Sequence, residues 1–285
     1  MILSMTGYGK ATVELPQKKV TVEIKTLNSK NLDLNVRVPT YYREKELEIR
    51  SKLSKQLVRG KVDFSIFIEI TGSETTTIIN KEVVNNYIDQ LRTIAVTSPE
   101  NTLEIAMRLP DALKTEREQL DESQWPLIDK AIDEAVEKVL TFRLDEGSVL
   151  KQDFTHRIQT IQHLSEQVMR LDKDRLLQIR ERLEKAITEL QQTVDENRFE
   201  QELIYYLEKL DITEEKVRLN NHLDYFLQEL NSTTSNGKKL GFISQEIGRE
   251  INTTGSKSNF APMQKVVIQM KDELEKIKEQ LLNVL

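Results

Sequence analysis

The sequence predicts an α+β protein: a small N-terminal antiparallel sheet domain with helices, then a long helical coiled-coil-like arm and a C-terminal helical domain. Three observations predict this class. Apolar residues alternate with period two in the first 70 residues, helical spacing fills most of the rest, and the 285 residues include only nine glycines and six prolines. Few residues of these two kinds favour long helices over many turns. We expect domains at 1–97, 98–196 and 197–285.

The sheet is predicted by alternating apolar residues over 20–24, 32–38 and 62–70. Such alternation is typical of half-buried strands. An earlier strand over 6–15 is expected to pair with the segment 20–24. Residues 41–58 have apolar positions four apart and predict a helix, so the expected order is strand, strand, strand, helix, strand.

After the sheet, Asn80 is a good N-cap for a helix that is expected to close the first domain. The pair Ser98-Pro99 predicts a break, and a short helix is expected over 102–108. From about Pro126 the pattern becomes helical for a long stretch.

The arm is predicted by apolar residues that step by three or four from Leu150 to Val194. This spacing is typical of a coiled coil. An unbroken helix over 147–194 would extend for on the order of 70 Å. An arm of that length needs a partner, which is either a returning helix or another subunit.

The C-terminal part predicts four further helices. They are expected over 197–210, from Asp211 to Leu230, over 241–259, and from Pro262 onward, where proline suits the first helical turn. A polar loop is expected over 231–237.

Composition excludes several classes of protein. The absence of cysteine removes disulfides, thiolate zinc sites and cysteine nucleophiles, and it fits a reducing compartment. No stretch of about 18 apolar residues and no basic leader occurs, so we expect a cytoplasmic protein that does not enter a membrane. Walker, HExxH and Gly-x-Ser-x-Gly patterns are also absent.

Charge is distributed unevenly along the chain. The net charge is −6, but residues 1–70 hold 13 Lys/Arg against 8 Asp/Glu. A basic module on an acidic body can attract an anionic polymer locally. The alternative is a chance excess of solvated lysines.

Two predicted helices carry clusters of polar side chains. Glu215, Arg218 and His222 are spaced three and four apart, so they share one face. This face is either an ordinary ion-pair ladder or part of a functional site. On the helix over 241–259, the isoleucines at 243, 247 and 251 bury one side while the acids and arginine share another.

That second face holds Glu246, Arg249 and Glu250. It is either a salt-bridged exterior or a site where acids hold a hard divalent ion and arginine meets phosphate. Glu202, on the helix before Asp211, would add a third acid if these helices pack together.

Several motifs resemble the YicC-type endoribonucleases, the group that includes YloC. The matching stretches, from residue 1 to residue 285, are SMTGYG, NSKNLDLNVRVP, RGKV, DEG, DITEEKVRLNNHLDYF and QEIGREINTTGSKSN. The sequence departs from that pattern at Ser29 and Asn31, where relatives often carry other residues, and at Gly248, where an asparagine is common. These departures place base-stacking or orienting roles at residues 29 and 31 in doubt.

The resemblance implies a cytoplasmic, metal-dependent endoribonuclease that assembles as a homohexamer with a clamp-like opening for RNA. It implies Mg²⁺ or Mn²⁺ as cofactor, and RNA, further copies of the chain and other RNA-degradation enzymes as partners. The residues expected to contact RNA are Asn28, Lys30, Arg37, Arg50, Arg59, Lys61 and Lys257. Single-stranded and structured RNA both remain possible substrates.

Two chemical routes to cleavage fit the residues. In the metal route, Glu246 and Glu250, with Glu202 or Glu215, hold the ion, while Arg218, Arg249 and Lys257 offset the charge that develops on phosphorus. In the metal-free route, His222 takes the proton from the ribose 2′-OH. We expect the metal route.

Two other classes of function stay open. One is a ring-shaped RNA-binding adaptor that presents RNA to a separate nuclease, with the polar clusters as subunit interfaces. The other is a structural helical assembly protein, which predicts no salt-sensitive RNA binding.

Overall fold

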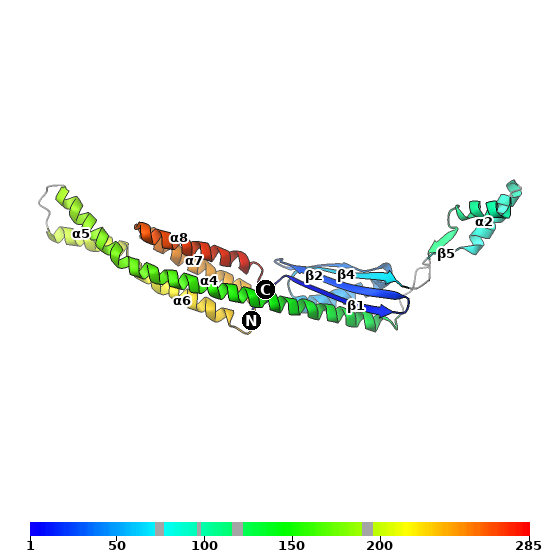
Figure 1. Cartoon of the computed structure of the whole chain (residues 1–285), viewed down its shortest axis with the longest axis horizontal. Coiled ribbons are helices and arrows are strands. Elements are labelled where there is room, and N and C mark those ends of the chain that lie inside the picture. The colour runs from blue at the N-terminus through cyan, green and yellow to red at the C-terminus, as the bar shows by residue number, and fades with distance from the viewer. Residues whose placement is uncertain (72–76, 96–97, 116–121, 190–195) are drawn as a thin grey trace.

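The computed structural model describes residues 1–71, 77–95, 98–115, 122–189 and 196–285. Figure 1 shows an elongated molecule in which a small unit, a sheet and a helical bundle follow one another along the long axis. The elements are β1 (Gly7–Leu15), β2 (Lys18–Leu27), β3 (Leu32–Arg37), η1 (Thr40–Lys45), α1 (Glu46–Leu57), β4 (Gly60–Ile70), β5 (Thr77–Ile79), α2 (Lys81–Ile94), α3 (Pro99–Met107), β6 (Leu113–Thr115), α4 (Trp125–Glu189), α5 (Glu196–Lys209), α6 (Thr213–Leu230), α7 (Gly237–Lys257) and α8 (Ala261–Leu281).

The α+β class is confirmed, and the first four strands form one sheet in the order β1-β2-β4-β3. Two pairings are antiparallel, as expected, but β3 and β4 are parallel. A parallel pair needs a crossover connection, and η1 and α1 supply it. The helix predicted over 41–58 therefore begins as a 3₁₀ turn and becomes α-helical only at Glu46.

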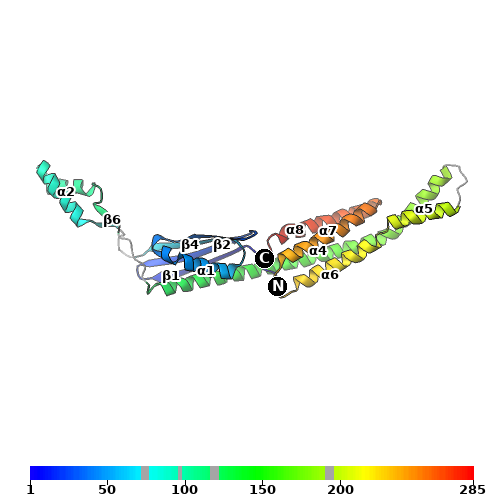
Figure 2. The ribbon, with the colours of Figure 1, turned by 180° about the vertical axis from the view of Figure 1, so that it is seen from behind.

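One face of the sheet packs against α1 and the first part of α4, as Figure 2 shows from behind. The alternating strand residues Val22, Ile24 and Phe64 are fully buried in this core with Leu53 of α1 and Ile132 of α4. Burial on one face only explains the period-two pattern of the strands.

The arm is longer than predicted. Helix α4 has 65 residues and begins at Trp125, close to Pro126, where the helical pattern was expected to begin, and it continues without a break past residue 147, where the coiled-coil-like arm was expected to start. Its first part covers the sheet, and its second part packs against α6 and α8. The expected partner of the arm is therefore a pair of returning helices of the same chain. The predicted arm residues 190–194 lie outside the described residues, and the domain division stays a prediction.

The C-terminal bundle consists of α6, α7, α8 and the second part of α4. Its core combines residues such as Phe154, Phe226, Ile247 and Met270, all buried. Helix α7 begins at Gly237, four residues earlier than predicted, because the Asn236 side chain accepts a hydrogen bond from the amide of residue 239. No helix in the described part of the chain is long and apolar enough to cross a membrane.

The two ends of the chain meet between the sheet and the bundle. Ser4 forms a β-bridge with Val284, and the Met5 amide donates to the Asn283 carbonyl at 2.8 Å. Gly147 allows this crossing, since a Cβ there would lie 2.1 Å from the Ile2 carbonyl oxygen. The motifs SMTGYG and DEG therefore meet at this junction.

The helix that follows Asn80 does not close the sheet domain, so that expectation is wrong. Helix α2 packs against α3, and β5 pairs with β6, in a separate unit over 77–115. Its own small core includes Val84, Ala106 and Ala112. The predicted break at Ser98-Pro99 lies between α2 and α3. Helix α3 begins at Pro99, three residues before the expected start, and the hydroxyl of its N-cap Ser98 accepts the amide hydrogen of residue 101.

An ion pair between α4 and α8 makes bundle stability depend on pH. Arg157 donates to Glu273 at 2.9 Å, and Lys276 and Arg157 hold the pKa of Glu273 below its usual range. A lowered carboxyl pKa stabilises the fold above the ordinary pKa, and this stability is lost as pH falls through the folded-state pKa.

We expect Glu273→Gln to lower the free energy of unfolding at pH 7 by about 1 kcal/mol or less, because the pair is partly exposed. The difference from wild type should shrink toward pH 3 in urea titrations. The control Glu275→Gln, whose partner Lys278 lies on the same helix, should change stability less. A difference that is constant with pH would contradict this assignment.

Candidate functional site

Helices α6 and α7 bring two sequence-predicted clusters into contact. The Lys257 ammonium, at the end of α7, donates to the Glu215 carboxylate at 2.7 Å and to the Asp211 carbonyl at 2.8 Å. Both acceptors lie at the start of α6, so the two helices run antiparallel. These two remote parts of the sequence therefore share one surface.

The ion pair fixes which side chains face one another further along the helices. His222 follows Glu215 by seven residues on α6, and Glu250 precedes Lys257 by seven residues on α7. Seven residues make almost two helical turns, so we expect His222 and Glu250 to lie at similar heights on the facing sides. We call these side chains, with their neighbours on the same faces, the polar row: Glu215, Arg218 and His222 on α6, and Glu246, Glu250 and Lys257 on α7.

The two acids of α7 lie one turn apart in this row. Glu250 is 8% exposed and has no hydrogen-bond or ion-pair partner among the described residues. Its oxygens are not among the fully buried unpaired atoms, so the stem is covered while the carboxylate reaches the surface. Glu246 is half-buried and bonds only Arg249. An unpaired carboxylate at a covered position is available to a ligand.

The two arginines of the predicted catalytic set are held in surface ion pairs. Arg218 bonds Glu214 at 2.5 Å, not Glu215, and Arg249 bonds Glu246 at 3.0 Å. Both guanidinium groups are largely exposed. Pairs of this kind contribute little to stability, so they can exchange for a phosphate at small cost.

A buried network that the sequence reasoning missed supports the row. Arg175 of α4 is 1% exposed and bonds Asp172, the Leu210 carbonyl and the Lys257 carbonyl at 2.8–3.1 Å. Lys216 of α6 bonds the other oxygen of Asp172. The sequence does hold a signal for this network: two charged residues, Asp172 and Arg175, interrupt the apolar stripe of the predicted arm. The network fixes the end of α7 against the start of α6.

Glu215 is the most enclosed acid of the row, at 6% exposed. Its second carboxylate oxygen is buried with no partner in the described residues. Nearby, hydrogen bonds from Thr213 lower the pKa of the Asp211 carboxyl. Burial acts in the opposite direction, and the charges of Lys216 and Lys257 lower this pKa further. The start of α6 therefore holds two carboxylates against two ammonium groups.

Glu202 does not join this row. It lies exposed on α5, beyond the bundle near the tip of α4 (Figure 1). Within the ranges that the structure describes, no group of three His, Asp or Glu side chains is arranged to hold a metal ion. Glu246, which is paired with Arg249, and Glu250 lie one helical turn apart on α7.

Four of the predicted RNA-contacting residues meet at one end of the sheet. Asn28 and Lys30 lie in the loop 28–31. Arg59 lies in the turn before β4, and Lys61 is the second residue of β4, so turn and strand start make up the segment 58–61. The Arg59 side chain donates to the Ser29 carbonyl at 2.9 Å, which ties loop and turn together. We call these two segments the cationic loop end.

The other predicted RNA contacts lie elsewhere. Arg37 is exposed further along β3, and Arg50 is engaged with Glu46 and the Leu34 carbonyl. Lys257 belongs to the polar row, at the far end of α7 from the junction. With a rise of 1.5 Å per residue, the length of α7 places Lys257 about 30 Å from the junction.

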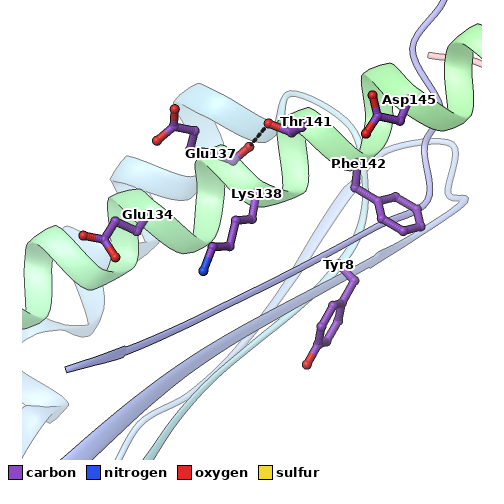
Figure 3. Close-up of a pocket in the computed structure, with 7 residues that line it drawn as sticks. All are labelled: Tyr8, Glu134, Glu137, Lys138, Thr141, Phe142 and Asp145. Carbon is purple, nitrogen blue, oxygen red and sulfur yellow. Dashed lines mark hydrogen bonds between the residues drawn. The ribbon is translucent and has the colours of Figure 1, made fainter. Parts of the chain in front are cut away.

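A pocket of about 550 Å³ lies between β1 and the part of α4 that covers the sheet (Figure 3). It is lined by Tyr8, Glu134, Glu137, Lys138, Thr141, Phe142 and Asp145. Its one cation, Lys138, donates to the Lys10 carbonyl at 2.8 Å. With three carboxylates and one lysine that is already bonded, the pocket disfavours phosphate, and none of its lining residues belongs to the polar row.

Fold and polar row together define a class of elongated α+β proteins, in which a sheet unit with a cationic loop end and a helical bundle with facing acids share one long helix. Family profiles described as "Endoribonuclease YicC-like, N-terminal region" and "Endoribonuclease YicC-like, C-terminal" match residues 2–152 and 168–285. The chain belongs to the YicC-like endoribonuclease family.

Curated relatives agree over the full length. A protein of Clostridioides difficile (strain 630) named "Probable endoribonuclease YicC" is 32% identical over 293 residues, covering all of both chains. A protein of the same name from Haemophilus influenzae is 29% identical over 287 residues, again with full coverage. The sequence-based assignment to this family is confirmed.

Proposed function

We propose that this chain is a metal-dependent endoribonuclease of the cytoplasm whose reaction takes place along the polar row. The observation that carries the proposal is the Lys257–Glu215 contact, because it aligns the acids of α7 with His222 and Arg218 of α6. The names of the relatives support ribonuclease activity in general.

The row supplies the groups that phosphodiester cleavage needs. Glu246 and Glu250, one turn apart, would hold Mg²⁺ or Mn²⁺, which typically binds one or two carboxylates and completes its shell with water and phosphate oxygens. A bound ion would lower the pKa of water and offset phosphate charge. Lys257 and Arg218 would bind the phosphate, and His222 faces the acids as a proton carrier.

The reaction products distinguish the two chemical routes. Attack by water typically leaves a 5′-phosphate, whereas attack by the ribose 2′-OH through His222 leaves a cyclic phosphate. Purified protein should cleave labelled RNA only with added divalent metal and leave 5′-phosphate ends. Metal-independent cleavage with cyclic phosphate ends would replace the metal route by the His222 route.

The adaptor alternative is favoured by one observation: Arg218 and Arg249 already have carboxylate partners, as residues in a protein interface would. Under this alternative, purified protein binds RNA but leaves it intact. A homohexamer and association with other RNA-degradation enzymes remain part of our proposal.

The cationic loop end and Arg37 are proposed to bind the RNA backbone. Arg37→Ala should weaken binding of unrelated RNA sequences by a similar factor, about two- to tenfold, and reduce the slope of affinity against salt by about one. Fluorescence anisotropy at several salt concentrations measures this. The control Lys114→Ala, on β6 of the separate unit, should leave affinity unchanged. Equal affinities for Arg37→Ala and wild type would show that this face is only solvated.

A further inference from the structure

Arg143 is a buried cation at the junction of sheet and bundle. It lies on α4, is 2% exposed, and no carboxylate pairs with it in the described part of the chain. Its guanidinium donates at 3.3 Å to three carbonyl oxygens, those of Met5, Leu57 and Arg59. Burial lowers the pKa of this group.

This arrangement is costly for stability alone. A buried charge is normally paired, and a well-packed apolar side chain of similar size is often equally stable or more stable. Here the Nε hydrogen also has no acceptor among the residues that the structure describes. A cation kept under these conditions needs a reason beyond packing.

The contacts of Arg143 lead directly to the cationic loop end. It holds the backbone of Arg59, whose own side chain donates to the Ser29 carbonyl at 2.9 Å. The Gly60 amide donates to the Asn31 carbonyl at 3.4 Å. The segment 58–61 and the loop 28–31 are therefore linked to α4 through one side chain, and both Lys30 and Lys61 are exposed on them.

We propose that Arg143 is a positioning residue for RNA binding: it fixes Arg59 and, through Arg59, the loop 28–31, so that Lys30 and Lys61 meet neighbouring phosphates of one RNA strand. The inference rests on the proposed function. Its charge has no carboxylate to cancel it, so the positive potential extends to the same surface and RNA supplies the counter-charge.

The test replaces Arg143 in the full chain and separates binding from turnover. Arg143→Met keeps a stem of similar packing but removes the charge and all donors. We expect Kd and KM for labelled RNA to rise about tenfold while kcat at saturating RNA stays within twofold. Arg143→Lys keeps the charge without the planar fork and should give an intermediate Kd.

A double-mutant cycle with Arg59→Ala tests the route of the effect. If Arg143 acts through Arg59, Arg143→Met should weaken binding less than twofold in the Arg59→Ala background. Independent, additive effects would overturn the proposed link. A fall in kcat and in the folded fraction with Kd unchanged would assign Arg143 a structural role only.

A separate control distinguishes failure of this inference from failure of the proposed RNA surface. The double variant Lys30→Ala/Lys61→Ala leaves the Arg143 contacts in place. If it binds RNA like wild type, the cationic loop end does not bind RNA and both proposals fail there. If it binds weakly while Arg143→Met and Arg143→Lys bind normally, only the role of Arg143 is overturned.

Discussion

Glu250→Gln is expected to lower kcat for RNA cleavage by about 100-fold or more, the scale for loss of a group that acts directly in the reaction. The same change should alter the free energy of unfolding by less than ~1 kcal/mol, because this carboxylate has no hydrogen-bond or ion-pair partner among the described residues, and glutamine keeps the shape of the side chain. Glu246→Gln should act in the same direction, since both acids lie on one face of α7.

Initial rates with labelled RNA over a Mg²⁺ and Mn²⁺ titration, with urea unfolding in parallel, measure both effects. Glu275→Gln on α8 is the matched control, because it removes the same charge from an exposed surface pair. Activity that survives in both α7 variants would point to a contaminating nuclease or to a different centre.

Gly9→Ala is expected to have the largest effect on folding. A Cβ at residue 9 would lie 2.0 Å from the Ala135 carbonyl oxygen and 2.9 Å from a Val139 methyl, both on α4. This clash can be relieved only if the strand and the helix move apart. We therefore expect the free energy of unfolding to fall by about 3 kcal/mol or more, the upper range for overpacking. Urea unfolding and the yield of folded protein measure it.

Gly241→Ala is the matched control for this substitution. A Cβ at that position meets nothing within 4 Å, and alanine favours a helix interior over glycine by about 1 kcal/mol. The control should therefore be as stable as wild type or more stable. A Gly9→Ala protein with wild-type stability would mean that β1 does not pack directly on α4.

Local patterns predicted the strands and most helices because burial on one face leaves a period in the sequence. They predicted that the helical pattern begins near Pro126, but not that one unbroken helix runs from there into the arm, because its first part packs on a sheet while its second part packs on helices, and the two environments impose different apolar stripes. The parallel pairing of β3 with β4 was also hidden, since alternation does not encode strand direction.

The candidate site could be predicted in part. Spacing placed Glu215, Arg218 and His222 on one face of α6, but only tertiary packing joins that face to Lys257, which is 42 residues away from Glu215. Spacing also failed to choose among ion-pair partners, because Glu214 and Glu215 are adjacent and Arg218 takes the former. The place of Glu202 depended on the direction of α5 beyond the bundle, which no local pattern determines.

The continuity of α4 constrains how the molecule can move. Helix α4 is on the order of 100 Å long, and both the sheet and the bundle pack against it. A hinge motion between sheet and bundle would require this helix to bend or some of its backbone hydrogen bonds to break. The sheet and the bundle of one chain are therefore expected to keep their placement along α4.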